Sequence, residues 1–210
     1  MEHPKTFFQE LFHFDNKELF LEGPLQPEVI ANYTLHPNLT SFRPVQAQKE
    51  ALVEIAGLPE GRINVIRDKD CIVGYVTFVY PDPLERWSEG KMENLIELGA
   101  IEIAPAYRAK GLGKELIRLS MLDEAMENYI IITTEYYWHW DLKGSGLDVW
   151  EYRKVMEKMM NAGGLTWFAT DDPEISSHPA NCLMARIGKN IDQESVEAFD
   201  QLRFVNRFMY

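Results

Sequence analysis

The part of the sequence best suited to chemistry is a turn with basic side chains and two glycines. It reads Arg108, Ala109, Lys110, Gly111, Leu112, Gly113, Lys114. If a helix begins here, its first backbone N–H groups have no partner within the helix, and the positive end of the helix dipole lies beside them. Glycines at 111 and 113 let a pyrophosphate approach that backbone without meeting a Cβ. The turn therefore predicts a phosphate-binding loop, to which Arg108 and Lys114 could add positive charge.

A strand, a turn and a helix must hold this loop in place. Residues 95–103 predict a strand, and Pro105 indicates a turn after it. Residues 112–128 carry apolar side chains at helical spacing, and residues 129–134 predict a buried strand. Because a helix connects them, the strands at 95–103 and 129–134 are expected to be parallel.

Two other phosphate-binding loops are excluded by position. A P-loop needs glycine where Arg108 stands and Ser or Thr where Glu115 stands, and a Rossmann fingerprint needs a third glycine at Leu116. The remaining pattern is Arg or Gln, two residues, Gly, one residue, then Gly or Ala. This pattern resembles the pyrophosphate loop of the GNAT acetyltransferases, and the elements expected between residues 62 and 135 resemble the GNAT core.

The resemblance implies a fold, a donor substrate and its binding residues. The fold is α/β (α+β), with a mixed, mostly antiparallel central sheet that contains one splayed parallel strand pair and is flanked by helices. The donor is acetyl-CoA, bound by residues 108–114. The backbone of Ile101, Glu102 and Ile103 would hold the pantetheine arm and polarise the thioester carbonyl. Neither a metal nor a covalent acetyl-enzyme is implied.

Three residues are candidates for catalysis. Lysine must lose a proton before it attacks a thioester, so a base is required. In GNAT enzymes that acetylate protein lysines, a glutamate stands fourteen residues before the first motif glycine, and this position is Glu97. Glu97 could also be an ordinary carboxylate that faces solvent at the end of a strand.

Glu102 is the second candidate for the base. Its odd separation from Glu97 places the two side chains on opposite faces of the strand unless a bulge intervenes. Tyr152 is the nearest match to the tyrosine that protonates the leaving thiolate in many GNAT enzymes. The usual landmarks of that helix are absent, and packing is the alternative role of Tyr152.

Other reactive side chains give weaker indications. The run of bulky residues 136–140 could line the acceptor groove or form a core wall with a polar rim, and His139 could act as a base or only as a hydrogen-bonding group. The five histidines show no metal spacing, and the two cysteines predict neither a disulfide framework nor a zinc ribbon. Cys182 is best interpreted as a small buried apolar residue.

The remaining elements frame the expected core. Residues 1–40 mix aromatics and prolines, which indicates irregular structure with a short helix near 27–33. Further elements are expected as follows: a helix at 44–56, a hairpin from 62–67 and 71–80, a mobile surface loop at 81–92, a helix at 147–161, a strand at 165–170, helices at 179–187 and 193–202, and a tail at 204–210. We expect a single GNAT domain over residues 1–210, with its core at 62–135 and with 1–40 and 165–210 as peripheral elaborations.

Composition limits the partners. The chain has 210 residues and is 46% hydrophobic, which favours one sizeable core. Its formal net charge of −12 repels nucleic acid. The negative charge could attract a cationic acceptor or could serve solubility alone. The N-terminus lacks the features of a signal peptide, and no apolar run reaches membrane-spanning length. A cytoplasmic protein without a membrane partner is therefore expected.

Similarity beyond the motif bears on the acceptor. The stretches 138–140 and 178–188 resemble protein-modifying GNAT enzymes of acetoin catabolism. This resemblance implies a protein acceptor, an active-site lysine of AMP-forming acetyl-CoA synthetase, which acetylation switches off by removing the positive charge. The alternatives are a small-amine acetyltransferase on the same fold and an acetyl-CoA-responsive binding module without turnover. The sequence does not indicate an oligomeric state.

Overall fold

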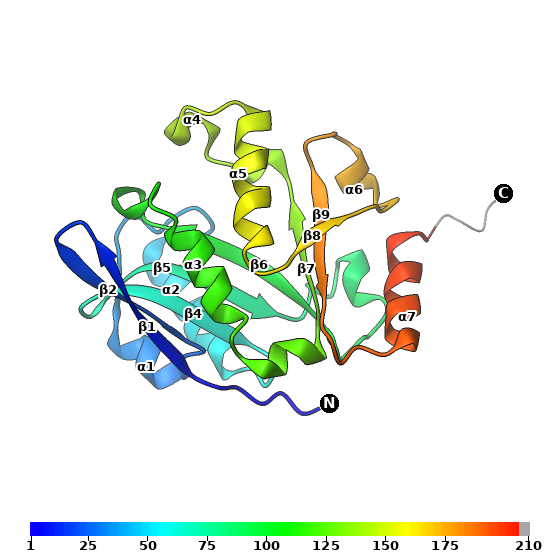
Figure 1. The fold of residues 1–210 in the computed structure, drawn as a ribbon, viewed down its shortest axis with the longest axis horizontal. Coiled ribbons are helices and arrows are strands. Elements are labelled where there is room, and N and C mark those ends of the chain that lie inside the picture. Colours follow the sequence, from blue (N-terminus) through cyan, green and yellow to red (C-terminus); the bar gives the residue numbers. More distant parts are fainter. Residues whose placement is uncertain (206–210) are drawn as a thin grey trace. The chain divides into compact units, whose positions relative to one another are not determined.

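The computed structural model describes residues 1–205, which form two compact units (Figure 1). The first unit comprises Met1–Tyr80 and Glu97–Met126, and the second comprises Pro81–Ile96 and the described residues from Glu127 onward. Among the described residues, no helix is both long and apolar enough to cross a membrane.

Five strands of the first unit follow one another as antiparallel neighbours in the order β1-β2-β4-β5-β6. Their bounds are β1 Phe8–Phe14, β2 Lys17–Gly23, β4 Arg62–Asp68, β5 Cys71–Val79 and β6 Leu95–Ile103. The short β3 (Thr34–Leu35) runs parallel to β5. The expected hairpin is thus confirmed as β4 and β5, and the expected third strand as β6.

The prediction of irregular structure for the N-terminal residues was wrong where β1 and β2 form a hairpin. Side chains along β1 alternate between more and less exposed positions, as in a strand with one covered face. Asp15 and Asn16 make the two-residue turn, and Asp15 has a φ of 52°. Asp and Asn tolerate positive φ, which two-residue hairpin turns require, so the signal for this hairpin was present in the sequence.

The helices of the first unit cover both faces of its sheet. They are α1 (Pro27–Asn32), α2 (Val45–Gly57) and α3 (Leu112–Ser120), with the 3₁₀ turn η2 (Pro105–Tyr107) before α3. Figure 1 shows α3 on one face of β4 and β5, with α1 and α2 on the other, and β4 is accordingly buried over its first five residues. The helix expected at 112–128 ends at Ser120. A separate 3₁₀ turn, η3 (Glu124–Asn128), follows it. The Asp123 carboxylate accepts from the backbone N–H of Ala125 and so stabilises the start of this turn.

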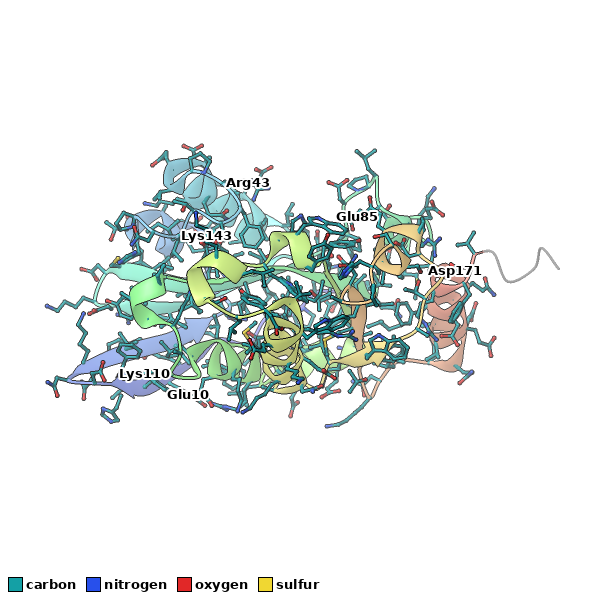
Figure 2. All side chains as sticks on the ribbon, turned by 90° about the horizontal axis from the view of Figure 1, so that it is seen from above. Glu10, Arg43, Glu85, Lys110, Lys143 and Asp171 are labelled. Atoms are coloured by element: carbon teal, nitrogen blue, oxygen red, sulfur yellow. The ribbon has the colours of Figure 1, made fainter. Side chains whose placement is uncertain are left out.

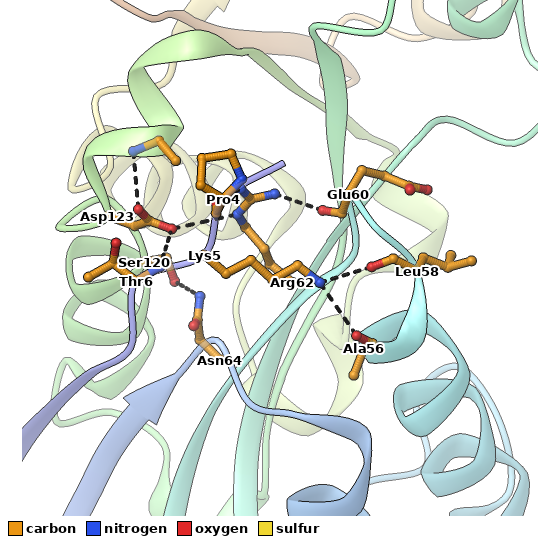
Figure 3. A network of polar contacts seen from close by, with 11 residues as sticks. Pro4, Lys5, Thr6, Ala56, Leu58, Glu60, Arg62, Asn64, Ser120 and Asp123 are labelled. Atoms are coloured by element: carbon orange, nitrogen blue, oxygen red, sulfur yellow. Dashed lines mark hydrogen bonds and ion pairs between the residues drawn. The ribbon is translucent and has the colours of Figure 1, made fainter. Parts of the chain in front are cut away.

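A buried arginine fixes the N-terminal segment onto this unit (Figure 3). Arg62 is 1% exposed and donates through its two terminal nitrogens to the carbonyls of Glu60 and Pro4, each at 2.8 Å. Its Nε lies 3.8 Å from the Asp123 carboxylate, which also accepts from the backbone N–H of Thr6. Backbone groups therefore offset part of the cost of burying this ion pair, by bonding to both terminal nitrogens of Arg62 and to the Asp123 carboxylate.

The second unit contains the rest of the sheet, in the order β6-β7-β9-β8, with Leu95 and Ile96 of β6 belonging to this unit. β6 and β7 (Ile130–Glu135) form the expected parallel pair. β9 (Cys182–Ile187) pairs antiparallel with both β7 and β8 (Thr166–Phe168). The prediction of a helix at 179–187 was therefore wrong. Its short apolar run is buried between two strands, and such a run lacks the alternation that identifies a strand.

The helices of the second unit are α4 (Leu142–Ser145), α5 (Val149–Asn161), α6 (Pro173–Ser176) and α7 (Gln193–Arg203), with 3₁₀ turns η1 (Arg86–Ser88) and η4 (Tyr137–His139). Helices were expected near α5 and α7, and both are confirmed. The loop expected at 81–92 is anchored, because Trp87 is 3% exposed and packs with Phe199 in the core of this unit. The expected tail at 204–210 lies outside the described residues beyond residue 205.

Candidate active site

The predicted phosphate loop leads into a helix, as the sequence indicated. Gly111 is the N-cap of α3 with a φ of 81°, and no side chain caps the helix. A Cβ added at Gly111 would meet nothing within 4 Å, so space is open beside the N-cap residue of α3. An uncapped helix N-terminus beside open space fits a pyrophosphate.

The basic side chains of the loop differ in what they contact. Arg108 Nε donates to the carbonyl of Ile103 at 2.8 Å, so this side chain braces the loop against the end of β6. Lys110 forms an ion pair with Asp15 in the β1–β2 turn and lies over the Phe14 ring, 4.7 Å from its centroid. Figure 2 shows Lys110 beside that hairpin. Lys114 makes no ion pair among residues 1–205 and remains available for an anion.

A bulge in β6 decides where its two glutamates point. Opposite β5, Leu98 pairs with Phe78 and Ala100 with Thr77, which leaves Gly99 as an extra residue. Glu97 therefore lies opposite Val79 and Glu102 opposite Tyr75, and these two partners are four residues apart on β5. Residues at even separation share a face, so the bulge brings Glu97 and Glu102 to the same face.

The Glu102 carboxylate is already fully engaged. One oxygen accepts from the backbone N–H groups of Thr40 and Ser41, each at 2.9 Å, and from the Ser41 hydroxyl at 2.7 Å. The other oxygen accepts from the Tyr75 hydroxyl at 2.9 Å. Burial, and then the charge of Glu102, raise the pKa of Tyr75, which therefore stays protonated as a donor. Glu102 thus ties residues 40–41 to β6. Glu97, by contrast, is only half-buried.

In the second unit, Tyr152 packs on a tryptophan that hydrogen-bonds to a buried glutamate. The Tyr152 ring on α5 stacks on the Trp140 ring, with centroids 5.3 Å apart and an angle of 19° between the planes. Trp140 Nε1 donates to Glu135 at the end of β7, over 3.2 Å. Glu135 is 7% exposed, and burial raises its pKa to about 7. Sequence reasoning missed Glu135, although a single acid that ends an apolar strand just before an aromatic run was visible.

Aromatic residues near η4 form a row of successive ring contacts, partly stacked and partly edge-to-face, that we call the aromatic ladder. Its members are Trp150, His178, Tyr137, Trp138 and Tyr136. His178 lies between Tyr137 (4.2 Å between centroids) and Trp150 (6.4 Å), and Trp138 stacks on Tyr136 at 4.8 Å. Trp138 and Trp150 are each 49% exposed, so the ladder forms part of the surface of the second unit rather than its core.

The cysteines and histidines show no assembled reactive centre within residues 1–205. No group of three or more His, Cys, Asp or Glu side chains there is arranged to hold a metal ion. Cys182 is a free, buried thiol, and burial raises its pKa to about 12. A thiol with so high a pKa is a poor nucleophile, in agreement with its interpretation as an apolar residue.

Comparison with known proteins identifies the class. The acetyltransferase (GNAT) family model matches residues 30–140, and the chain belongs to this family. It is an acetyl-CoA-dependent acetyltransferase with the GNAT fold. The uncapped helix N-terminus at Gly111 fits the CoA pyrophosphate that this family binds.

Particular relatives resemble the whole chain. The acetoin utilization protein AcuA of Bacillus licheniformis is 69% identical and that of Bacillus subtilis 68% identical, each over 210 residues and the full length of both chains. The crystal structure of an acetoin utilization protein from Exiguobacterium sibiricum superposes with a TM-score of 0.96 at 58% identity, and covers 99% of this chain and 98% of that chain.

Proposed function

We propose that the protein transfers the acetyl group of acetyl-CoA directly to a lysine side chain of another protein, AMP-forming acetyl-CoA synthetase, in the cytoplasm. The observation that carries the proposal is the full-length identity of 68–69% to proteins named for acetoin utilization. This identity supports a role in acetoin utilization. The acceptor itself is inferred from the resemblance of residues 138–140 and 178–188 to protein-modifying GNAT enzymes.

The donor is held by the first unit. The N–H groups at the start of α3 and the Lys114 ammonium bind the pyrophosphate, and the braced position of Arg108 keeps the loop in shape. The backbone of Ile101–Ile103 binds the pantetheine arm. These residues pair regularly with β5 beyond the bulge at Gly99, so they form a straight, extended stretch of backbone along which an arm can lie.

The proton of the acceptor goes to Glu97. Its carboxylate takes the proton from the lysine ammonium, the amine nitrogen bonds to the thioester carbon, and the carbon–sulfur bond breaks to release the thiolate, which is then protonated. We assign the base to Glu97 rather than Glu102 because Glu102 already accepts four hydrogen bonds, and a proton would displace at least one of them. Tyr152 is the candidate that protonates the thiolate.

A protein acceptor suits the surface of the second unit better than a small amine. Exposure of tryptophan side chains to water is energetically unfavourable, and tryptophan is enriched at protein–protein interfaces. Trp138 and Trp150 of the aromatic ladder are both half exposed. The net charge of −12 adds attraction for a lysine-bearing surface.

The proposal is tested with purified protein, acetyl-CoA and acetyl-CoA synthetase, with acetylated lysines located by mass spectrometry. Glu97→Gln is compared with Glu54→Gln, which removes the same charge from an exposed position on α2. Loss of a general base is expected to slow the reaction about 10²–10⁴-fold in Glu97→Gln, with Glu54→Gln unchanged.

Two other results would redirect the proposal. Acetylation of small amines but not of the synthetase would support the alternative, a small-molecule amine acetyltransferase. Full activity of Glu97→Gln would remove Glu97 as the base while leaving the donor and the acceptor in place.

A further inference from the structure

One buried carboxylate of the second unit has an unusually poor set of partners. Glu135 is 7% exposed, yet its two oxygens accept only from the Thr133 hydroxyl at 3.4 Å and from Trp140 Nε1 at 3.2 Å. Both donors are neutral, and both distances are long for a bond to a carboxylate. No basic side chain among residues 1–205 forms an ion pair with Glu135.

Two other buried glutamates have carboxylates whose hydrogen bonds and ion pairs offset the cost of burial. Glu22 is 2% exposed and accepts from two nitrogens of Arg67 as well as from Gln9 and Tyr33. Glu102 is 4% exposed and accepts from four donors at 2.7–2.9 Å. A buried carboxylate normally costs stability unless it is paired in this way, so the weak pairing of Glu135 calls for an explanation.

Neutral side chains surround Glu135. Glu135 and Thr133 lie on one face of β7, opposite Cys182 and Met184 of β9, whereas the core cluster with Ile130 and Ile132 lies on the other face. On the Glu135 face, the Trp140 indole meets the carboxylate with its N–H edge, and the Tyr152 ring stacks on one face of that indole. Electron-rich rings of this kind attract ammonium groups, which places two such rings close to an uncompensated carboxylate.

The charged groups nearby leave the carboxylate without a counter-ion. Cys182 on β9 lies opposite Glu135 and is neutral, since burial and the charge of Glu135 hold its pKa at about 12. On α5, the charges of Arg153 and Glu157 act on Cys182 in opposite directions, and Arg153 donates to the carbonyl of Pro179 at 2.6 Å. The raised pKa of Glu135, with burial as its largest cause, agrees with this lack of compensation.

We infer that Glu135, together with Trp140 and Tyr152, binds the primary ammonium group of the acceptor. The incoming ammonium supplies the counter-ion that the described chain lacks, and the carboxylate gains a charged hydrogen bond in return. This inference deepens the proposed function, because it assigns the residue that selects a cationic acceptor.

The binding step is measured with n-butylammonium as a probe and n-butanol as the neutral probe of the same length, on the full chain without acetyl-CoA. Tryptophan fluorescence reports binding, and Trp140→Phe shows which part of the signal comes from Trp140. Variants are Glu135→Gln, which keeps size and an acceptor oxygen, and Glu157→Gln, which removes an exposed charge from the neighbouring helix α5. The titrations are made at pH 8 and pH 6.

At pH 8 we expect the natural protein and Glu157→Gln to bind butylammonium roughly tenfold or more tightly than butanol, the gain expected for a hydrogen bond to a charged group. In Glu135→Gln this preference should vanish, and in the natural protein it should weaken at pH 6. Equal binding of the two probes, or a preference that survives in Glu135→Gln, would overturn the inference. Because no acetyl transfer is measured, this result is independent of whether the synthetase is the acceptor.

Discussion

Replacing Glu135 by glutamine should stabilise the protein at high pH and do much less at low pH. In an unfolded chain a glutamate has a pKa near 4.5, whereas burial raises the pKa of Glu135 to about 7 in the folded protein. Between these values the folded state binds more protons than the unfolded state, so this group lowers the stability as pH rises. Above pH 7 both states are ionised, and the cost stays constant.

The size of the effect follows from the two pKa values. Each unit of difference corresponds to about 1.4 kcal/mol, and most of the interval between 4.5 and 7 is crossed between pH 5 and pH 8. The carboxylate should therefore cost about 2–3 kcal/mol more at pH 8 than at pH 5. Glutamine does not ionise, so the variant escapes this cost while keeping the contact with Trp140.

The assay is urea unfolding of the natural protein and of Glu135→Gln at both pH values, with the variant-minus-natural difference compared between them. This subtraction removes the titration of all groups that the two proteins share. A difference that is the same at pH 5 and pH 8 would show that Glu135 titrates normally in the fold. The burial argument, and with it the need for a counter-ion, would then fail.

Three further variants test the first unit. Gly111→Ala places a side chain at a φ of 81° and into the open space beside the N-cap of α3. The free energy of unfolding, measured in urea, should fall by about 1–2 kcal/mol, and the KM for acetyl-CoA should rise. Glu102→Gln should cost about 1–3 kcal/mol and increase hydrogen exchange at the amide of Ser41, whose donor loses a charged acceptor. Arg62→Met leaves Asp123 buried without its ion-pair partner and should lower the unfolding free energy by about 3–5 kcal/mol, and Asp123→Leu in the same chain should recover much of it.

The loop before α3 was predictable because its conformation is determined locally. Gly111 stands where a left-handed residue begins a helix, and the apolar spacing of residues 112–120 identifies that helix without any tertiary information. The strand before it and the parallel strand after it follow from the same short segment and from the need for a crossover. Whether Glu97 and Glu102 point to the same face of β6 depended on one bulge, which the sequence allowed but did not require.

The features that were missed depend on distant partners. β9 is a short apolar run whose structure is decided by β7 and β8 on its two sides, so its own periodicity is uninformative. The Glu135 carboxylate lacks charged partners because, among the described residues, no basic side chain pairs with it after folding. A sequence pattern does not reveal such an absence. The β1–β2 hairpin was different, since Asp15 and Asn16 carried a turn signal that the surrounding aromatics and prolines obscured.

The bulge at Gly99 also changes how relatives should be compared with this chain. A Cβ at residue 99 would meet only the Thr77 hydroxyl at 3.6 Å, an ordinary contact, so the bulge does not depend on glycine. A relative that lacks this one residue could pair regularly and still present an acid opposite the position of Val79, and its acid would then stand thirteen rather than fourteen residues before the motif glycine. Equivalent acids in this family should therefore be identified by the residue that they face on the neighbouring strand. Counting residues back from the motif glycine would align the wrong side chain in such a relative.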